Sequence, residues 1–261
     1  CIVITHIAEI TKKHLIGIRE NMQLIININL DKQLILPLNY NHIVQSIIYR
    51  ALSVIPEYAD FIHDNGYMNG NRSFKMFNFS QLKGEYRIEG RNIIFSNFVS
   101  LEVRSPLSML INILKYSFET NGIAFGEKTF NDVLVEIYDY TIEDSEINIE
   151  MNSPVTVYST DEYTGNTYYY APTDVEFSDM IDANFKRKYF SYYGVRLYSN
   201  VEIELLNNTA PRKMVTKYQG LYINAWFGRY RLSGERKYLD FLYQTGLGSK
   251  NSQGFGMFSL V

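Results

Sequence analysis

Apolar positions along the first half of the chain switch between the spacing of strands and that of helices. Gln23–Leu30 is a β-branched apolar run and predicts the first strand. A helix is predicted next, with Asn39 or Asn41 as its cap, because apolar residues then recur every three or four positions. These positions are Val44, Ile47, Ile48, Ala51, Leu52 and Ile55. The opposite face of this helix carries His42, Gln45 and Tyr49.

The pattern after this helix completes a recognisable order of elements. It predicts a short helix at Glu57–His63, a loop at Asp64–Ser73 and strands at Phe74–Phe79 and Asn92–Phe98. Ser105-Pro106 then predicts the capped start of a helix that ends at Asn121-Gly122, and a strand follows near Val133–Tyr138. The resulting order, β-α-β-β-α-β, is that of a ferredoxin-like domain.

The second half repeats this order. The predicted elements are a strand at Ile147–Tyr158 interrupted at Pro154, a helix from Asp174 to Tyr193, strands at Val201–Leu206, Arg212–Tyr218 and Leu221–Arg231, a helix from Ser233 to Thr245, and a strand at Gly256–Val261. We therefore expect an α+β fold of two tandem ferredoxin-like, RNA-recognition-type domains, residues 22–140 and 141–261. Residues 1–21 are expected to be an extension, because the strand pattern begins only at Met22.

Composition and charge narrow the function classes. The chain of 261 residues is 46% hydrophobic and 15% aromatic, and its single cysteine excludes an internal disulfide and points to a reducing, cytoplasmic setting without membrane spans. The net charge of −3 conceals an asymmetry: residues 141–185 hold ten acids and no Lys or Arg, whereas residues 186–261 hold twelve Lys or Arg and four acids. A polyanion could bind the last third of the chain, although two solvated faces of opposite sign would give the same counts.

Four glycines fall within the eleven residues Gly246–Gly256, a segment that we call the glycine loop. Such density indicates positive φ angles or a close backbone approach. The spacing matches neither a dinucleotide fingerprint nor a P-loop. We expect the loop to let an RNA backbone or the first domain come close, with Lys250 as a phosphate contact.

No HExxH motif, His-x-His pair or cysteine cluster supports a metal or cofactor site. Among the four histidines, His63 is best placed for proton transfer, since it ends a predicted helix before a loop. An ordinary surface histidine remains the alternative for His63, as do a solvated lysine for Lys75 and a boundary tyrosine for Tyr49.

The glycine loop, together with Asn39-Tyr40, Gln45 and Ile48-Tyr49, resembles the CRISPR-associated repeat-RNA-processing endoribonucleases, the Cas six family. Asn152-Ser153-Pro154-Val155 is similar to the start of that family's second domain. The resemblance implies metal-independent cleavage of CRISPR repeat RNA, in antiviral defence, by attack of a 2′-hydroxyl that leaves a 2′,3′-cyclic phosphate and a 5′-hydroxyl. It implies His63, Tyr49 and Lys75 as the catalytic residues.

The expected RNA-binding residues are Gln45, Gly246, Gly248, Ser249, Lys250, Gly254, Phe255 and Gly256. Further candidates for phosphate contacts are Lys186, Arg187, Lys188, Arg212, Lys213, Lys217, Arg229 and Arg231, and Tyr40 is a second candidate for base stacking beside Phe255. The alternative function is a non-catalytic RNA-binding subunit of a CRISPR ribonucleoprotein, and a third is a small-molecule-binding α+β protein. Other complex subunits and a second copy of the chain remain open as partners.

Overall fold

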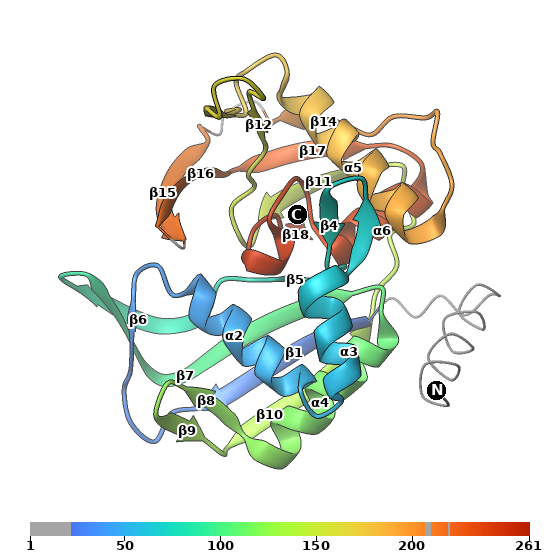
Figure 1. Cartoon of the computed structure of the whole chain (residues 1–261). Helices are drawn as coiled ribbons and strands as arrows, with labels where there is room; N and C mark the ends of the chain where they lie inside the picture. The colour runs from blue at the N-terminus through green and yellow to red at the C-terminus, as the bar shows by residue number, and fades with distance from the viewer. Residues whose placement is uncertain (1–21, 207–209, 219) are drawn as a thin grey trace, which may run out of the picture.

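A computed structural model describes residues 22–206, 210–218 and 220–261, and it shows a mixed α/β chain built on two antiparallel sheets, one above the other (Figure 1). The extension expected at residues 1–21 lies outside the described residues. Two buried clusters correspond to the two sheets, one formed by residues between Leu24 and Val135 and the other mainly by residues between Ile142 and Phe258.

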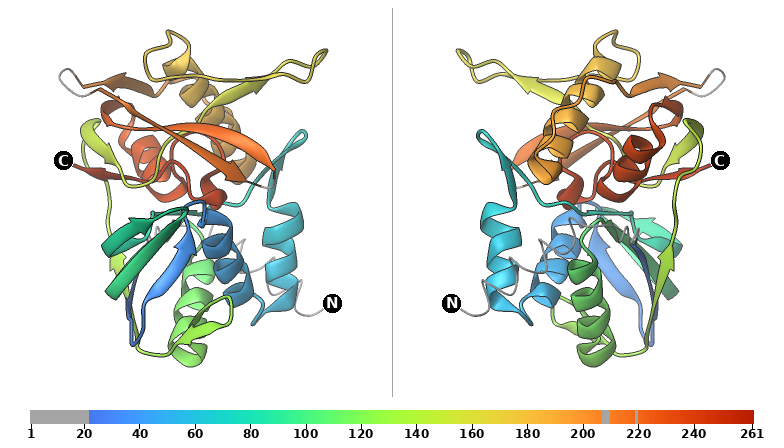
Figure 2. Two further views of the ribbon diagram at one scale, coloured as in Figure 1. Left: turned by 90° about the vertical axis from the view of Figure 1, so that its left-hand side faces the viewer. Right: turned by 90° about the vertical axis from the view of Figure 1, so that its right-hand side faces the viewer.

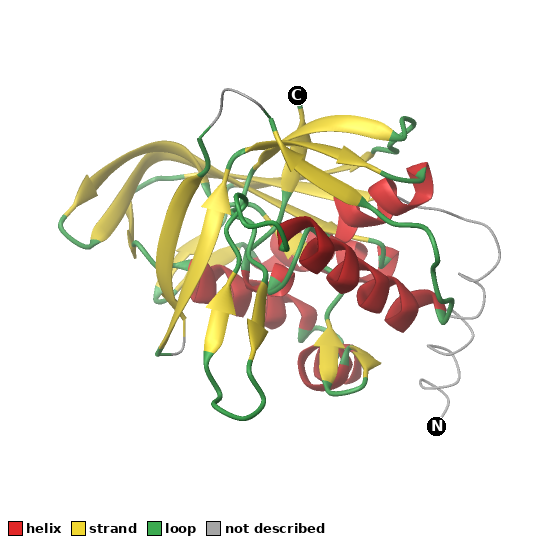
Figure 3. Cartoon of the chain, turned by 90° about the horizontal axis from the view of Figure 1, so that it is seen from above, coloured by secondary structure: helices red, strands yellow, loops and turns green. Residues whose placement is uncertain are grey.

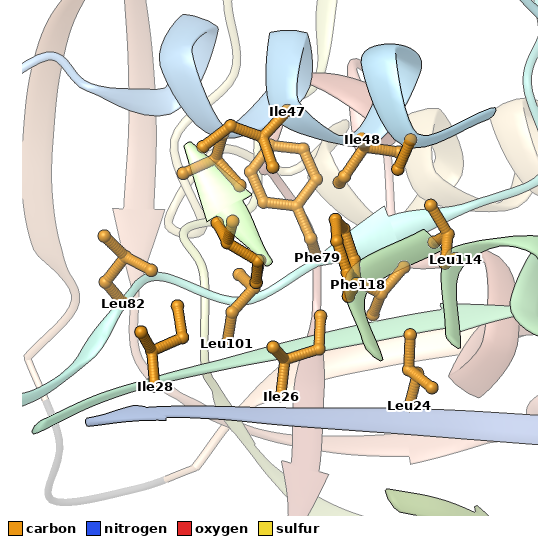
Figure 4. Packing of buried hydrophobic residues seen from close by; sticks show 14 of the residues in the cluster. Leu24, Ile26, Ile28, Ile47, Ile48, Phe79, Leu82, Leu101, Leu114 and Phe118 are labelled. Carbon is orange, nitrogen blue, oxygen red and sulfur yellow. The ribbon is translucent and has the colours of Figure 1, made fainter. Parts of the chain in front are cut away.

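The lower sheet has the order β10-β1-β7-β2, and two further strands, β5 and β6, also pair with β7. Its strands are β1 (Met22–Asn29), β2 (Leu34–Pro37), β5 (Asn78–Phe79), β6 (Lys83–Glu89), β7 (Asn92–Ser105) and β10 (Val133–Asp139). Helices α2 (Asn41–Leu52) and α4 (Ser108–Asn121) cover one face of this sheet (Figure 2). Between them and the sheet, Ile47 and Ile48 of α2 pack towards Phe79, Leu101 and Ile26 (Figure 4).

The upper sheet has the order β14-β17-β11-β18. Its strands are β11 (Glu146–Met151), β14 (Glu202–Leu205), β17 (Arg229–Ser233) and β18 (Phe258–Leu260), and its helices are α5 (Phe177–Tyr193) and α6 (Arg236–Thr245). Among the described residues, four two-stranded hairpins are separate from the two sheets: β3 (Tyr67–Asn69) with β4 (Arg72–Phe74), β8 (Ile123–Phe125) with β9 (Lys128–Phe130), β12 (Tyr158–Thr160) with β13 (Thr167–Tyr169), and β15 (Arg212–Tyr218) with β16 (Leu221–Phe227).

Most predicted elements are present, but several boundaries were wrong. The loop expected at Asp64–Ser73 contains the β3–β4 hairpin, β2 and β6 were not predicted, and the strand expected at Leu221–Arg231 is two strands separated at Gly228. The helix expected at Glu57–His63 is α3 (Pro56–Asp60), followed by a π-helical turn, η1 (Phe61–Asn65).

Both predicted helix caps were wrong because the side chains bind elsewhere. Ser105 ends β7, and its hydroxyl donates to the Met76 carbonyl and accepts from the Leu107 amide. The residue that caps α2 is Tyr40, not Asn39 or Asn41. Asn41 instead donates its side-chain amide to the carbonyls of Gln253 and Gly254, 3.0 and 3.2 Å away, and so holds the glycine loop.

Arg104 joins the two sheets. The residue lies on β7 of the lower sheet, its side chain is 2% exposed, and it forms an ion pair with Glu102. One of its guanidinium nitrogens donates to the Phe258 carbonyl on β18, at 2.6 Å, and the guanidinium carbon lies 3.6 Å from the centroid of the Tyr243 ring on α6. The buried charge is therefore compensated by groups from both halves.

The glycine loop packs between the two halves. A Cβ atom on Gly254 would lie 2.5 Å from the Phe79 ring of the lower sheet, and one on Gly256 would lie 2.0 Å from the Leu247 carbonyl. The ammonium group of Lys188 fastens the loop from within, since it donates to the Gly246 carbonyl and to the Asn251 side chain, both at 2.7 Å. We expected the glycine loop to let either an RNA backbone or the first half of the chain come close, and the close approach of the first half is observed.

We expect Arg104→Ala to lower the free energy of unfolding by about 3–5 kcal/mol, because it leaves Glu102 buried without its cation. The matched control is Arg87→Ala, which removes an exposed ion pair with Glu89 and should cost about 1 kcal/mol or less. Denaturant titration of both variants measures the difference. Equal losses would contradict the anchoring role of Arg104.

We expect Gly256→Ala to destabilise the protein by more than about 3 kcal/mol or to prevent folding, because the added methyl group would overlap the Leu247 carbonyl. Gly126→Ala is the control, since Gly126 also has a positive φ but faces open space, and it should cost only about 1–2 kcal/mol. Thermal unfolding of the two variants tests this prediction. A Gly256→Ala protein as stable as the Gly126→Ala protein would refute the close packing.

Candidate active site

A cleft of about 630 Å³ lies where the two halves meet, above helix α2. Figure 1 shows the β15–β16 hairpin and the β3–β4 hairpin on opposite sides above α2, and the lining includes Lys217 and Tyr218 of β15 and Lys75, which directly follows β4. The lining residues come from both halves: Asn39, His42, Gln45, Ser46, Tyr49, His63, Lys75, Lys217, Tyr218, Gly220, Ser252 and Gln253. The cleft thus brings together His63, Tyr49, Lys75 and Gln45, four of the residues singled out from the sequence.

His63 lies on the π-helical turn η1, which ends at Gly66 with a φ of 60°. Its Nδ1 lies 2.7 Å from a carboxylate oxygen of Asp64, and the side chain is 64% exposed. The ring of Tyr49 meets the imidazole edge to face, with 4.9 Å between the ring centroids. A carboxylate only accepts hydrogen bonds, so this contact favours the tautomer with the proton on Nδ1 and leaves Nε2 free to accept one.

Tyr49, on α2, is half-buried: it packs against the buried cluster of the lower half and also lines the cleft. Burial and, after it, the nearby Tyr218 raise the pKa of Tyr49 to about 12, against the opposing effect of a hydrogen bond with the Ser252 side chain. At neutral pH its hydroxyl is therefore protonated and can donate a hydrogen bond. Its ring also packs on Phe77, at 5.9 Å between centroids, which holds the side chain in place.

Lys75 follows strand β4 and returns to the turn that carries His63. Its ammonium group donates to the carbonyl oxygen of His63 at 2.7 Å. Burial lowers the pKa of Lys75, and the charge of Asp64 opposes that shift. Gly66 makes this arrangement possible, because a Cβ at that position would lie 2.7 Å from the Phe74 carbonyl and 3.0 Å from Lys75 Cδ.

The second half contributes the remaining wall of the cleft. Tyr218, at the end of β15, donates its hydroxyl to the Gln45 side chain, and the Asn39 side chain donates to the Lys217 carbonyl at 3.2 Å. Ser252 and Gln253 come from η2 (Asn251–Gln253), a 3-10 turn within the glycine loop. The density of glycines could have pointed to these last two residues, whereas Tyr218 carries no signal in the sequence.

Several residues expected to contact RNA are buried. Phe255 is fully buried beside Ile223 and Ala225, and Tyr40 is 5% exposed with its hydroxyl accepting from the Leu82 amide, so neither ring is free to stack on a base. Lys188 is enclosed by the glycine loop, and burial lowers its pKa to about 7, so it is not a surface phosphate contact. Gly246, Gly248, Gly254 and Gly256 are buried as well.

Other predicted contacts are accessible to different degrees. Ser249 and Lys250 are half-buried, and the ammonium of Lys250 lies 5.1 Å from the Tyr158 ring centroid. The cations of Lys186, Arg229 and Arg231 are paired with acids. Those of Arg212, Lys213 and Lys217 lie over the rings of Phe227, Trp226 and Tyr222 across the β15–β16 hairpin.

Within residues 22–206, 210–218 and 220–261 there is no group of three or more His, Cys, Asp or Glu side chains that could hold a metal ion. No helix in this part of the chain is long and apolar enough to cross a membrane.

Comparisons with known sequences all find Cas6 proteins. The C-terminal model of the CRISPR-associated protein Cas6 matches residues 135–260. The chain is 27% identical over 248 residues to the CRISPR-associated endoribonuclease Cas6 1 of Methanocaldococcus jannaschii, and the match covers 92% of each chain. It is 26% identical over 244 residues to the CRISPR-associated endoribonuclease Cas6 of Pyrococcus furiosus, covering 87% of this chain and 84% of that protein.

Solved structures agree with this result over the whole fold. A structure of a CRISPR-associated protein Cas6 has a TM-score of 0.75 at 25% identity and covers 93% of this chain and 100% of its own. A structure of a Cas6-related protein from Pyrococcus furiosus has a TM-score of 0.75 at 19% identity, covering 92% of this chain and 98% of that one. Sequence and fold comparisons together support a Cas6-family endoribonuclease.

Proposed function

We propose that this protein is an endoribonuclease that cuts CRISPR repeat RNA in the cleft between its two halves. The observation that carries the proposal is the convergence of Tyr49, His63 and Lys75 on one cleft. Two curated relatives are named CRISPR-associated endoribonucleases, which supports the same activity here. The product of such cleavage would be mature guide RNA, made in the cytoplasm.

The chemistry that these side chains support is transesterification without a metal ion. The 2′-hydroxyl attacks the adjacent phosphorus, the bond from phosphorus to the 5′-oxygen breaks, and a 2′,3′-cyclic phosphate and a 5′-hydroxyl result. The reaction requires a base for the 2′-hydroxyl proton, an acid for the departing oxygen and donors for the phosphorane charge.

Each requirement has a candidate in the cleft. Nε2 of His63 takes the proton of the 2′-hydroxyl, because Asp64 holds the proton on Nδ1. The hydroxyl of Tyr49 donates to a phosphoryl oxygen. The ammonium of Lys75 stabilises the negative charge and, since its pKa is lowered, gives a proton to the 5′-oxygen more readily than a solvated lysine would.

We also interpret the two sheets and their helices as two tandem ferredoxin-like domains, residues 22–140 and 141–261. Strand order supports this, because β10-β1-β7-β5 and β18-β11-β17-β14 are equivalent when each half is numbered in chain order. The first domain would carry the catalytic residues, and the second would hold RNA with Ser249 and Lys250. Other subunits of a CRISPR complex, or a second copy of the chain, remain candidate partners.

We expect His63→Ala to reduce cleavage of the repeat RNA from the protein's own locus by about 10²–10⁴-fold in EDTA, with RNA binding largely retained. The measurement is a single-turnover cleavage assay with analysis of the 2′,3′-cyclic end. His42→Ala is the comparison, since this histidine lines the same cleft but bonds to the Asn39 carbonyl, and it should lose far less activity. RNA binding without any cut by the wild-type protein would favour the alternative, a non-catalytic RNA-binding subunit.

We expect Tyr49→Phe to slow cleavage by about 10²-fold, as for the loss of one donor to a charged transition state. Because the pKa of Tyr49 is about 12, the pH dependence of the rate between pH 5 and 9 should keep its shape in this variant. Tyr116→Phe, an exposed tyrosine on α4, is the control. A pH–rate profile that loses one limb in Tyr49→Phe would show instead that Tyr49 transfers a proton.

A further inference from the structure

Two arginines from different halves of the chain, Arg72 and Arg187, lie on elements that pack against each other. Arg72 begins strand β4, where it pairs with Asn69 of β3 across the hairpin. The Asn69 side chain donates to the carbonyl of Arg187 on α5, at 3.2 Å. The rings of Tyr67 and Tyr192 pack between the same two elements, with 5.2 Å between centroids. Figures 1 and 3 show the hairpin standing above the end of α3 and beside α5.

The charges of these two arginines are not compensated. In the part of the chain that the structure describes, neither Arg72 nor Arg187 has a carboxylate within 4 Å, and the buried Nε of Arg187 has no hydrogen-bond partner. Burial and, after it, the charge of Arg72 lower the pKa of Arg187. The neighbouring cations on α5 differ, since Lys186 pairs with Asp182 and Lys188 is held by oxygen atoms of the glycine loop.

Two guanidinium groups with unused donors form a natural site for a phosphate. Like charges held side by side repel each other, and an anion between them would relieve that repulsion. The planar fork of each guanidinium matches two oxygens of a phosphate group, and its hydrogen bonds to a charged acceptor are about twice as strong as those between neutral groups. The packing of the hairpin on α5 would hold the two forks in place before the anion arrives.

Arg72 lies close along the chain to Lys75, which lines the cleft. The β3–β4 hairpin is the segment that connects His63 to Lys75. Arg72 precedes Lys75 by three residues, so their Cα atoms are at most about 10 Å apart. A single RNA strand with one phosphate at Lys75 would thus pass within reach of Arg72 and Arg187.

We propose that Arg72 and Arg187 form a second phosphate-binding site, which holds an internal phosphodiester of the RNA strand a few nucleotides from the bond that is cut. The proposal rests on the function proposed above and deepens it. It gives the two arginines the role of fixing the path and register of the strand, with the chemistry left to the cleft. In the sequence analysis Arg187 is one of several candidates for phosphate contacts, and Arg72 is not predicted to bind RNA.

The test measures RNA binding in the His63→Ala background, so that binding is recorded without cleavage. The probe is the repeat RNA transcribed from the protein's own locus, and the variants are Arg72→Gln, Arg187→Gln and both together. We expect the double variant to bind about 10–100-fold more weakly, as for the loss of charged hydrogen bonds. The slope of log affinity against log salt concentration should fall in magnitude by about 1 for a lost phosphate contact.

Controls separate this proposal from stability effects and from the proposed function. Arg87→Gln removes the same charge from β6, where the arginine is paired with Glu89, and should leave the affinity within about twofold. Arg72→Gln alters an exposed side chain and so tests the site even if Arg187→Gln folds poorly. Unchanged affinity and salt slope in the double variant would overturn the second site, and failure of the His63→Ala parent to bind the RNA would overturn the proposed function as well.

The register of the strand can be tested separately. Neutral methylphosphonate linkages, placed one at a time along the RNA, should identify one linkage near the cut whose neutralisation weakens binding to the His63→Ala parent. The same linkage should have no further effect on the double arginine variant, since the contact is already gone. Equal, additive losses in both proteins at every linkage would contradict the assignment.

Discussion

The junction around Arg104 is the contact on which the arrangement of the two halves depends. The arginine belongs to the lower sheet, yet the groups that compensate its charge include the Phe258 carbonyl and the Tyr243 ring of the upper half. A buried charge fixes geometry more sharply than apolar packing does, because any displacement leaves donors without acceptors. Apolar surfaces alone could slide past one another, whereas this junction has one favourable register.

The shape of the cleft depends on how the two halves are placed relative to each other, because both contribute to its lining. Its reactive side chains come from the first half, but Ser252 reaches Tyr49 from the glycine loop, and Tyr218 reaches Gln45 from the β15–β16 hairpin. Neither half forms the cleft by itself. The glycine loop is consequently a structural part of the site, held on one side by Asn41 and on the other by Lys188.

The sequence predicts the order of the main elements well because their apolar spacing is regular. It also predicts Tyr49, His63 and Lys75 as neighbours, although only through the resemblance, since they are far apart along the chain. The use of Ser105 and Asn41 could not be predicted. Both residues have the side chains of helix caps, but their hydrogen bonds go to Met76 and to the glycine loop, which are brought near only by the tertiary fold.

The burial of predicted contact residues was missed for a similar reason. Phe255 and Lys188 have the residue types of RNA contacts, and composition does not reveal that the loop folds inward. The short strands β2 and β6 were missed because their pairing with the long strand β7, and not their own apolar pattern, keeps them in the sheet. Tertiary contacts thus decide most of what the pattern leaves open.

The hydrogen bonds from Asn41 to the carbonyls of Gln253 and Gly254 have a kinetic consequence. They join residues 212 and 213 positions apart, and contacts of such separation form slowly because a very long loop must close first. The helix that carries Tyr49 and the strands beneath it can assemble from nearer contacts. The wall formed by the glycine loop is therefore expected to be among the last parts of the molecule to fold, and a competent cleft would appear only at the end of the folding reaction.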